Sequence, residues 1–382
     1  MKQQRYSGYL LDPSITFLNH GSFGATPIPV FKTYQDWQQK LETQPVLFIA
    51  RQSPGLLNEA RAILAQYLHC KADELVYVTN STYGVNAIAR SLDLKPGDEV
   101  LTSNQEYGAT NRTWQFLAQK AGFTYKVQKL STPFTSTKEL IDEFWQGVTP
   151  NTKVIFLSHI TSETATIFPV KEICRRARKT GILTLIDGAH APGQIDLDLH
   201  DMDCDFYTGN LHKWVCSPKG SAFLFARESL HDMLEPLVVS FGWQPVENGP
   251  SPLVDYHQYI GTRELAAFLS VPAAITYQQQ RNWPVVRQQC HDLVTYALEQ
   301  VDKITGLDSI YTSDSWYGQF AAFKLPNHWD VDQTKNTLYD QYQIELPIYI
   351  WNEQLFGRIS IQEYNTKSDV ENLLEAIRKM VE

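Results

Sequence analysis

The sequence predicts an α/β fold, in which short buried strands alternate with helices and build a largely parallel sheet. Two observations support this prediction. Short apolar, β-rich runs occupy residues 75–79, 98–102, 154–158 and 182–186. Helical patterns lie between the runs, one ending at residue 92 and one near residues 170–179. Connections in such folds are right-handed and ligands bind at the carboxyl ends of the strands, so functional residues are expected there.

The elements that flank this pattern indicate two domains. Upstream, Ser53-Pro54 opens a helix with a cap residue and a proline, and an apolar stripe at helical spacing follows. Residues 243–259 are rich in Pro, Gly and Asn and predict a passage between domains. A helical stretch at 264–281 and an amphipathic helix near 368–381 follow. We therefore expect a large α/β domain at residues 17–255 and a smaller C-terminal α+β domain at residues 256–382, joined by the N-terminal segment 1–16.

The composition is that of an ordinary globular protein, with 43% hydrophobic and 20% charged residues. A formal net charge of −9 disfavours a nucleic-acid or anionic-membrane partner. The N-terminus lacks an apolar signal core, and no run approaches the roughly 18 apolar residues of a membrane span. The five cysteines are scattered and show no metal-ligand spacing. We expect a soluble cytoplasmic protein with reduced cysteines and no bound metal.

The strongest chemical signal is a pair of residues, Asp187 and Lys213. Asp187 follows directly on the run at 182–186, so it should lie at the carboxyl edge of the sheet. A carboxylate there can keep a pyridine nitrogen protonated. Lys213 lies 26 residues later, and a lysine amine can form a Schiff base with an aldehyde cofactor and then move protons at a substrate Cα. These two are the predicted catalytic residues.

Longer motifs surround this pair: Asp187-Gly-Ala-His-Ala191, Asn210-Leu-His-Lys-Trp214 and Pro218-Lys-Gly-Ser-Ala222. With them, the chain resembles the class V aminotransferases, enzymes of fold type I that use pyridoxal 5′-phosphate (PLP). The family includes cysteine desulfurases and isopenicillin N epimerases. The motifs Leu18-Asn-His-Gly-Ser22 and Gly261-Thr-Arg-Glu264 resemble the isopenicillin N epimerase branch. The resemblance implies a mainly parallel seven-stranded sheet in the large domain, with PLP held by Lys213 and Asp187.

The resemblance also implies a phosphate site. Ser81 and Thr82 would meet the PLP phosphate where a strand enters a helix, although Asn80-Ser-Thr82 by itself is equally well a helix cap. Asn210 and His212 would face the same phosphate. Thr262 resembles the residue that reaches the phosphate from a neighbouring subunit. A homodimer with composite active sites is therefore expected.

Three further side chains are cofactor-binding candidates. Tyr107 stands where related enzymes stack an aromatic or histidine ring over the pyridine, although a single Tyr is commonly a packing residue. His190 stands where many relatives have a Gln that contacts the PLP phenolic oxygen, and one of its ring nitrogens can donate. His159, at a strand end, is a cofactor-side, substrate-side or purely structural residue.

The remaining candidates concern the substrate. Arg358 is expected to hold an α-carboxylate, because a guanidinium can make two charge-assisted bonds to it. Without the resemblance, this arginine would be interpreted as a surface residue. Asn19, His20 and Gly21 belong, by resemblance, to a segment at the substrate entrance.

The leading hypothesis is an isopenicillin N epimerase-like enzyme that acts at Cα of an amino-acid-type substrate through an aldimine and a quinonoid. Returning the proton to the opposite face needs a second acid, for which Tyr107, His159 and His190 are candidates. Alternatives are a cysteine or cystine C–S lyase, an aminotransferase, and a catalytically silent ligand-binding relative. A desulfurase is disfavoured, because residues 344–358 contain no cysteine to accept sulfur.

Overall fold

The structure is a computed structural model that describes residues 6–382. Its largest sheet has seven strands in the order β2-β8-β7-β6-β5-β3-β4. Six of them run in the same direction, and β8 alone is antiparallel to its neighbours β2 and β7. The predicted α/β fold with a mainly parallel seven-stranded sheet is confirmed. The strands are β2 (Leu75–Val78), β3 (Glu99–Ser103), β4 (Thr124–Gln128), β5 (Thr152–Ser158), β6 (Leu183–Asp187), β7 (Phe206–Asn210) and β8 (Ala222–Ala226).

Both faces of this sheet are covered, so its strands carry apolar residues on both sides. Val154 and Phe156 of β5 pack on one face, together with residues of α4, α5 and α9. Ile155 and Leu157 point to the other face and join the larger core with α3 and α7. The helices of these two layers are α2 (Ile28–Thr43), α3 (Ser53–Tyr67), α4 (Ser81–Ser91), α5 (Gly108–Ala121), α6 (Thr137–Trp145), α7 (Val170–Lys179), α8 (Leu199–Met202) and α9 (Pro252–Gln258).

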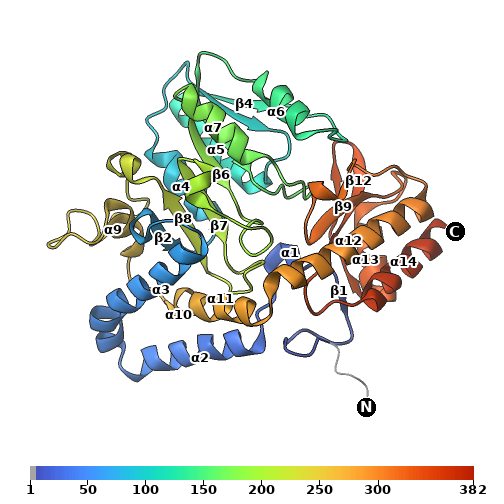
Figure 1. Ribbon diagram of the computed structural model, residues 1–382, viewed down its shortest axis with the longest axis horizontal. Helices are drawn as coiled ribbons and strands as arrows, with labels where there is room; N and C mark the ends of the chain where they lie inside the picture. Colours follow the sequence, from blue (N-terminus) through green and yellow to red (C-terminus); the bar gives the residue numbers. More distant parts are fainter. Residues whose placement is uncertain (1–5) are drawn as a thin grey trace.

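The C-terminal part, orange to red in Figure 1, has its own antiparallel sheet in the order β11-β12-β9. Helices α12 and α14 pack against each other, and α12 also contacts β9. A two-stranded parallel pair, β1 with β10, ties the N-terminal segment to this part. The elements are β1 (Thr16–Phe17), β9 (Phe320–Lys324), β10 (Ile344–Glu345), β11 (Ile348–Trp351), β12 (Gln354–Ser360), α10 (Ala266–Leu269), α11 (Val271–Gln280), α12 (Trp283–Thr305), α13 (Val331–Tyr342) and α14 (Lys367–Val381).

The helical stretch expected at 264–281 is two helices, α10 and α11, separated at Ser270. Pro272 stands at the start of α11, and a proline lacks the N–H that would continue a single helix. The expected passage at 243–259 contains the short helix α9. The boundary between the two domains stays a prediction.

Residues 6–16 of the N-terminal segment contact the C-terminal part. Tyr6 and Tyr9 make edge-on ring contacts with Tyr364. Residues 1–5 of the predicted segment 1–16 lie outside the described residues. Within residues 6–382, no helix combines the length and apolarity that crossing a membrane requires. In the same part of the chain, no group of three or more His, Cys, Asp or Glu side chains could hold a metal ion.

Candidate active site

A cavity of about 360 Å³ lies at the carboxyl edge of the large sheet. It forms there because β2, β3, β5, β6 and β7 all end at this edge, and the chain leaves each strand with polar residues. The structure brings eight of the predicted site residues to its wall: Ser81, Thr82, Tyr107, Asp187, His190, Asn210, His212 and Lys213.

Lys213 follows β7, and its amine is inside the protein. Burial lowers the pKa of this amine to about 7, and the positive charge of Arg358 acts in the same direction. Asp187 and Glu163 partly oppose that shift. The amine is therefore neutral over much of the range above pH 7, which is the form that attacks an aldehyde or removes a proton.

His190 lies beside that amine, with Nε2 2.9 Å from Lys213 Nζ. The indole N–H of Trp214 points at the other ring nitrogen, Nδ1, at 3.3 Å. Burial holds the pKa of His190 well below its usual value, so the ring is neutral. We assign the proton to Nε2, because Nδ1 must accept from the indole. His190 thus presents a hydrogen-bond donor to the cavity. Phe320 stacks on its ring, with 4.7 Å between the ring centroids.

Asp187 is the last residue of β6 and is buried at the bottom of the cavity. Its Oδ1 accepts a hydrogen bond of 3.0 Å from the backbone N–H of Ala189. Burial raises the pKa of this carboxyl to about 6, while the Ala189 N–H and Lys213 lower it. An ionised carboxylate in this position is stabilised by a cationic ring nitrogen placed next to it.

The turn between β2 and α4 forms one wall of the cavity and carries hydrogen-bond donors. Asn80 caps α4 by accepting from the N–H of Tyr83 at 2.8 Å. The N–H of Ser81 donates to Asn210 Oδ1 at 2.9 Å, which leaves the amide NH₂ of Asn210 as a donor. The Ser81 hydroxyl is buried and has no hydrogen-bond partner within the described part of the chain. A helix N-terminus with an unused hydroxyl is the setting that binds phosphate.

His212 is also part of this wall, and one of its ring nitrogens already makes a hydrogen bond within the protein. Its Nδ1 lies 3.2 Å from the carbonyl oxygen of Ser221, so Nδ1 carries the proton. Burial and the nearby Lys213 lower the pKa of this ring to about 4. A bound phosphate would favour the protonated ring, because opposite charges stabilise each other in a buried site.

The other predicted residues do not line the cavity. Arg358, on β12, lies directly behind it and donates to the carbonyl of Ser162 and to the hydroxyls of Ser162 and Ser22. Both serines are part of the cavity wall. His159 is buried, with Nδ1 2.9 Å from the Tyr207 hydroxyl, and its backbone N–H donates to the Asp187 carbonyl.

The entrance segment and Thr262 also lie away from the wall. Asn19 donates to Glu345 Oε1 at 2.9 Å and accepts from Ser22. His20 is fully buried, and Gly21 packs against Trp214 and Ser360. Thr262 is exposed on the surface of the single chain.

Two residues at or next to the cavity wall were not predicted from the sequence. Ser162 shares the cavity wall with Ser158 and accepts from Arg358. Glu106 is buried beneath that wall, where its carboxylate accepts from the Ser103 hydroxyl at 2.6 Å and from the N–H and hydroxyl of Ser158 at 2.7 and 2.6 Å. Burial raises the pKa of Glu106 to about 7. Both residues follow strand ends, so the carboxyl-edge rule could have found them.

The fold and the site together define a class of protein: an α/β protein in which a buried lysine, an acidic sheet-edge residue and a helix N-terminus surround one cavity. Comparison with known proteins then identifies the family. Residues 26–373 match the family described as aminotransferase class-V, and the chain belongs to it.

Individual relatives agree with this assignment. The chain is 34% identical over 385 residues to the isopenicillin N epimerase of Amycolatopsis lactamdurans, covering 97% of this chain and 96% of that protein. It is 25% identical over 404 residues to the probable chloroplastic L-cysteine desulfhydrase of Arabidopsis thaliana, with 97% and 84% covered. The solved apo structure of a cysteine desulfurase from Thermococcus onnurineus NA1 superposes with a TM-score of 0.84 at 19% identity, covering 100% and 98% of the two chains.

The residues present fit PLP, the cofactor of this family. The unpartnered Ser81 hydroxyl and the N-terminus of α4 suit its phosphate, and Asp187 suits its ring nitrogen. The Lys213 amine lies in the same cavity for its aldehyde. When bound, PLP supplies an electron sink for the charge that develops at a substrate Cα. The protein is a PLP-dependent enzyme.

Proposed function

We propose that this enzyme removes the proton at Cα of an amino-acid-type substrate and returns it with a change of configuration, as an epimerase or racemase. The observation that carries the proposal is the buried Lys213 amine, whose pKa is lowered to about 7 in a cavity shared with Asp187. A group with a pKa near the working pH is an efficient base and acid. The relative named isopenicillin N epimerase, aligned over nearly the whole chain, supports the same chemistry.

Arg358 is the proposed carboxylate-binding residue. Its guanidinium now donates to Ser162 and Ser22, which line the cavity, so a substrate carboxylate has to reach it past these two serines. Its Nε is buried and has no partner within residues 6–382. A carboxylate that accepts from the guanidinium would orient the substrate Cα in a fixed geometry.

Tyr107 is the proposed acid for the opposite face. Of the three candidates, His159 is engaged with Tyr207 behind the wall, and His190 contacts the Lys213 amine itself. Tyr107 lines the cavity at the N-terminus of α5, which follows β3 and not the strand that precedes Lys213, and it is 47% exposed. A hydroxyl on that side could deliver a proton that Lys213 cannot.

The test uses the PLP-loaded enzyme in D₂O with a panel of L-amino acids and L-aminoacyl peptides. We expect deuterium at Cα and the appearance of the D-configured centre. In Tyr107→Phe, we expect exchange into the L-substrate to persist while inversion falls by at least about tenfold, because the ring remains and only the proton donor is lost. Exchange without any inversion in the wild-type enzyme would reject the epimerase proposal.

A second candidate is elimination of a β-leaving group, as in a C–S lyase. The relative named as a probable L-cysteine desulfhydrase favours it. It needs the same proton removal at Cα but no acceptor cysteine, and residues 344–358, which lead to Arg358, contain none. Release of pyruvate and sulfide from L-cysteine, with no D-product, would select this function instead.

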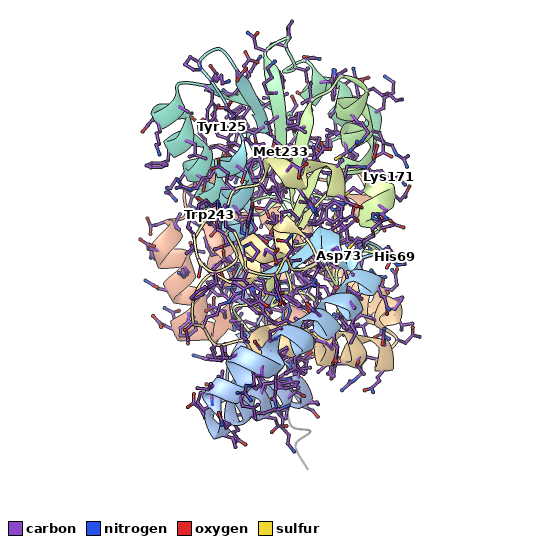
Figure 2. All side chains as sticks on the ribbon, turned by 90° about the vertical axis from the view of Figure 1, so that its left-hand side faces the viewer. His69, Asp73, Tyr125, Lys171, Met233 and Trp243 are labelled. Carbon is purple, nitrogen blue, oxygen red and sulfur yellow. The ribbon has the colours of Figure 1, made fainter. Side chains whose placement is uncertain are left out.

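We also propose that the chain works as a homodimer in a reducing compartment such as the cytosol. All five cysteines, which lie within the described residues, are free thiols, and four are buried. Trp243 lies on the face that Figure 2 turns to the viewer, in a loop that also carries Phe241 and Val246, which are 92% and 104% exposed. This loop packs on α9, which leads to Thr262. Exposed apolar side chains of this size are typical of a protein interface.

Co-expressed variants test the composite site. Thr262→Ala and Lys213→Ala should each give homodimers with weakened or abolished PLP attachment. If Thr262 acts across the interface, a mixed dimer of the two variants contains one complete site, so about half of the sites should attach PLP as the wild-type protein does. A mixed dimer without any complete site would place Thr262 and Lys213 in the same site and reject the arrangement.

A further inference from the structure

The backbone that carries Lys213 is a tight turn held from several sides. The Lys213 carbonyl accepts from the N–H of Cys216 at 3.0 Å, and Cys216 itself has a left-handed φ of 62°. The Trp214 carbonyl accepts from the side-chain amide of Gln278 at 2.7 Å. The Trp214 indole points at His190. The backbone position from which the Lys213 side chain starts is therefore set partly by contacts with other chain segments.

His20 makes one of these contacts from the far end of the sequence. Its Nε2 lies 3.0 Å from the carbonyl oxygen of Lys213, and its Nδ1 lies 3.0 Å from the hydroxyl of Tyr364. The ring is fully buried, and burial lowers its pKa to about 3, so it is neutral. A carbonyl only accepts, which assigns the proton to Nε2 and leaves Nδ1 to accept from Tyr364. The amide nitrogen of Gln362 lies farther away, at 3.4 Å from Nε2.

The short helix that begins with His20, α1 (His20–Phe23), fits this turn closely. Figure 1 shows it between the large sheet and the C-terminal elements. A side chain at Gly24 would place its Cβ 1.9 Å from the carbonyl oxygen of His212, and one at Gly21 would meet Ser360 at 2.8 Å. Gly24 allows the end of α1 to approach the backbone of His212 and Lys213, and Gly21 allows the helix to approach the side chains of Ser360 and Trp214. The contact of His20 with Lys213 is thus part of a close packing of three chain segments.

We infer that His20 is a positioning residue for Lys213: through its bonds to the Lys213 carbonyl and the Tyr364 hydroxyl, it fixes the turn from which the amine reaches the cofactor. Both ring nitrogens of His20 are used inside the protein, and the ring does not line the cavity. The inference rests on Lys213 as the cofactor lysine, but it holds for any reaction at Cα. It gives the N-terminal and C-terminal segments a joint role in cofactor attachment.

The test measures attachment of PLP itself to the full-length apoprotein, by borohydride trapping and by the pH midpoint of the visible absorbance of the lysine-bound cofactor. His20→Ala should weaken covalent attachment by about tenfold, because a buried hydrogen bond to the lysine backbone is lost. It should also shift the absorbance midpoint. His20→Gln should recover attachment to within about threefold, because its amide nitrogen can take the place of Nε2.

His231→Ala is the matched control. His231 is also buried, and its Nε2 lies 2.9 Å from the backbone carbonyl of Ala226, away from the cavity. This variant should be destabilised toward urea about as much as His20→Ala. Its PLP attachment and absorbance midpoint should stay unchanged. Equal loss of attachment in both alanine variants, or a His20→Gln variant no better than His20→Ala, would overturn the inference.

Tyr364→Phe serves if His20→Ala does not fold. It keeps the His20 ring but removes the hydroxyl that Nδ1 accepts from, so a smaller loss of attachment and a midpoint shift in the same direction are expected. An unchanged midpoint in Tyr364→Phe would also overturn the inference. Wild-type protein that attaches PLP but fails to invert substrates would reject the epimerase proposal and leave the role of His20 standing.

Discussion

Lys213 and Asp187 show how burial prepares a site before any cofactor binds. Burial lowers the pKa of the amine to about 7 and raises the pKa of the carboxyl to about 6. Above pH 7, the amine is therefore neutral while the carboxylate is charged. These are the two forms needed to attack an aldehyde and to stabilise a protonated ring nitrogen.

The first prediction concerns the pH dependence of this amine. In the apoprotein, the rate of covalent PLP attachment should rise with pH through about 7, because only the neutral amine is a nucleophile. Stopped-flow absorbance between pH 5.5 and 9 measures it, with Nα-acetyl-lysine as the reference for an exposed amine. A rate that still rises as steeply at pH 9 as that of the reference would show that burial does not lower the pKa of Lys213.

Glu106 gives a prediction about stability. Its pKa is raised to about 7 from 4.5, so between these values the folded protein keeps a proton that the unfolded chain has released. Stability from this group is present at low pH and is lost as pH rises through that window. Relative to Glu106→Gln, the wild-type protein should lose on the order of 3 kcal/mol of unfolding free energy between pH 4.5 and 7. Urea unfolding at both pH values tests it, and parallel profiles would contradict it.

At the scale of elements, α1 and α4 contribute to the site in different ways. Helix α4 turns its N-terminus toward the cavity, with Asn80 as its cap. Helix α1 holds the backbone around Lys213 from behind, and it can do so because Gly24 brings no side chain. Helix α4 thus contributes hydrogen-bond donors, while α1 fixes the position of the backbone around Lys213.

Gly24→Ala should therefore destabilise the protein more than alanine does at a positive-φ glycine with open space around it. Gly24 and Gly181 share a φ of 72°, but a Cβ at Gly181 would meet nothing within 4 Å. Gly181→Ala should cost about 1–2 kcal/mol for the left-handed backbone. Gly24→Ala should cost at least about 3 kcal/mol, because Gly24 combines its positive φ with a ψ of 165°, a backbone region that essentially only glycine adopts, and the clash with the His212 carbonyl is added. Urea unfolding compares them, and PLP affinity should fall only in Gly24→Ala; equal costs would show that α1 adjusts freely.

Substituting Asn80, the N-cap of α4, distinguishes a role in helix stability from a role in PLP binding. Asn80→Ala should destabilise by about 1 kcal/mol and also weaken PLP binding, because the cap orders the donors at the phosphate wall. Ser136 caps α6 in the same way, accepting from the N–H of Glu139 at 3.2 Å. Ser136→Ala should cost similar stability and leave the Kd for PLP unchanged. Equal PLP affinity in both variants would limit Asn80 to capping.

At the scale of the whole molecule, we expect two copies of the chain to form a homodimer. If the loop with Phe241 and Val246 lies in an interface, Phe241→Asp should shift the protein from twice the chain mass of 43.7 kDa toward the single-chain mass. Sedimentation over a range of protein concentrations measures this shift. Phe116→Asp on α5, where Phe116 is also exposed, is the control and should leave the mass unchanged. Wild-type protein that stays at 43.7 kDa would reject the homodimer.

Much of the fold was predictable from local patterns. The strands at β2, β3, β5 and β6 were expected within two residues of their ends, because each is a short apolar run bounded by polar or turn residues. Strands β4, β7 and β8 of the large sheet were not identified, although Phe206-Tyr-Thr208 and Ala222–Ala226 are also apolar or β-rich. The break between α10 and α11 depended on a proline whose effect was not anticipated.

The sequence by itself determined the fold class, the family and the pair Asp187 and Lys213, because these depend on periodicity and on motifs that are contiguous in the chain. Only the tertiary structure decided which other residues meet them. It placed Ser162 at the cavity and Glu106 beneath the cavity wall, and it turned His20 inward to the Lys213 carbonyl. It also assigned the proton of His190 to Nε2, because the indole N–H of Trp214 points at Nδ1. The reason is physical: the His20–Lys213 contact joins residues 193 positions apart, and the geometry of such contacts is set by packing across the sheet edge, which local sequence does not encode.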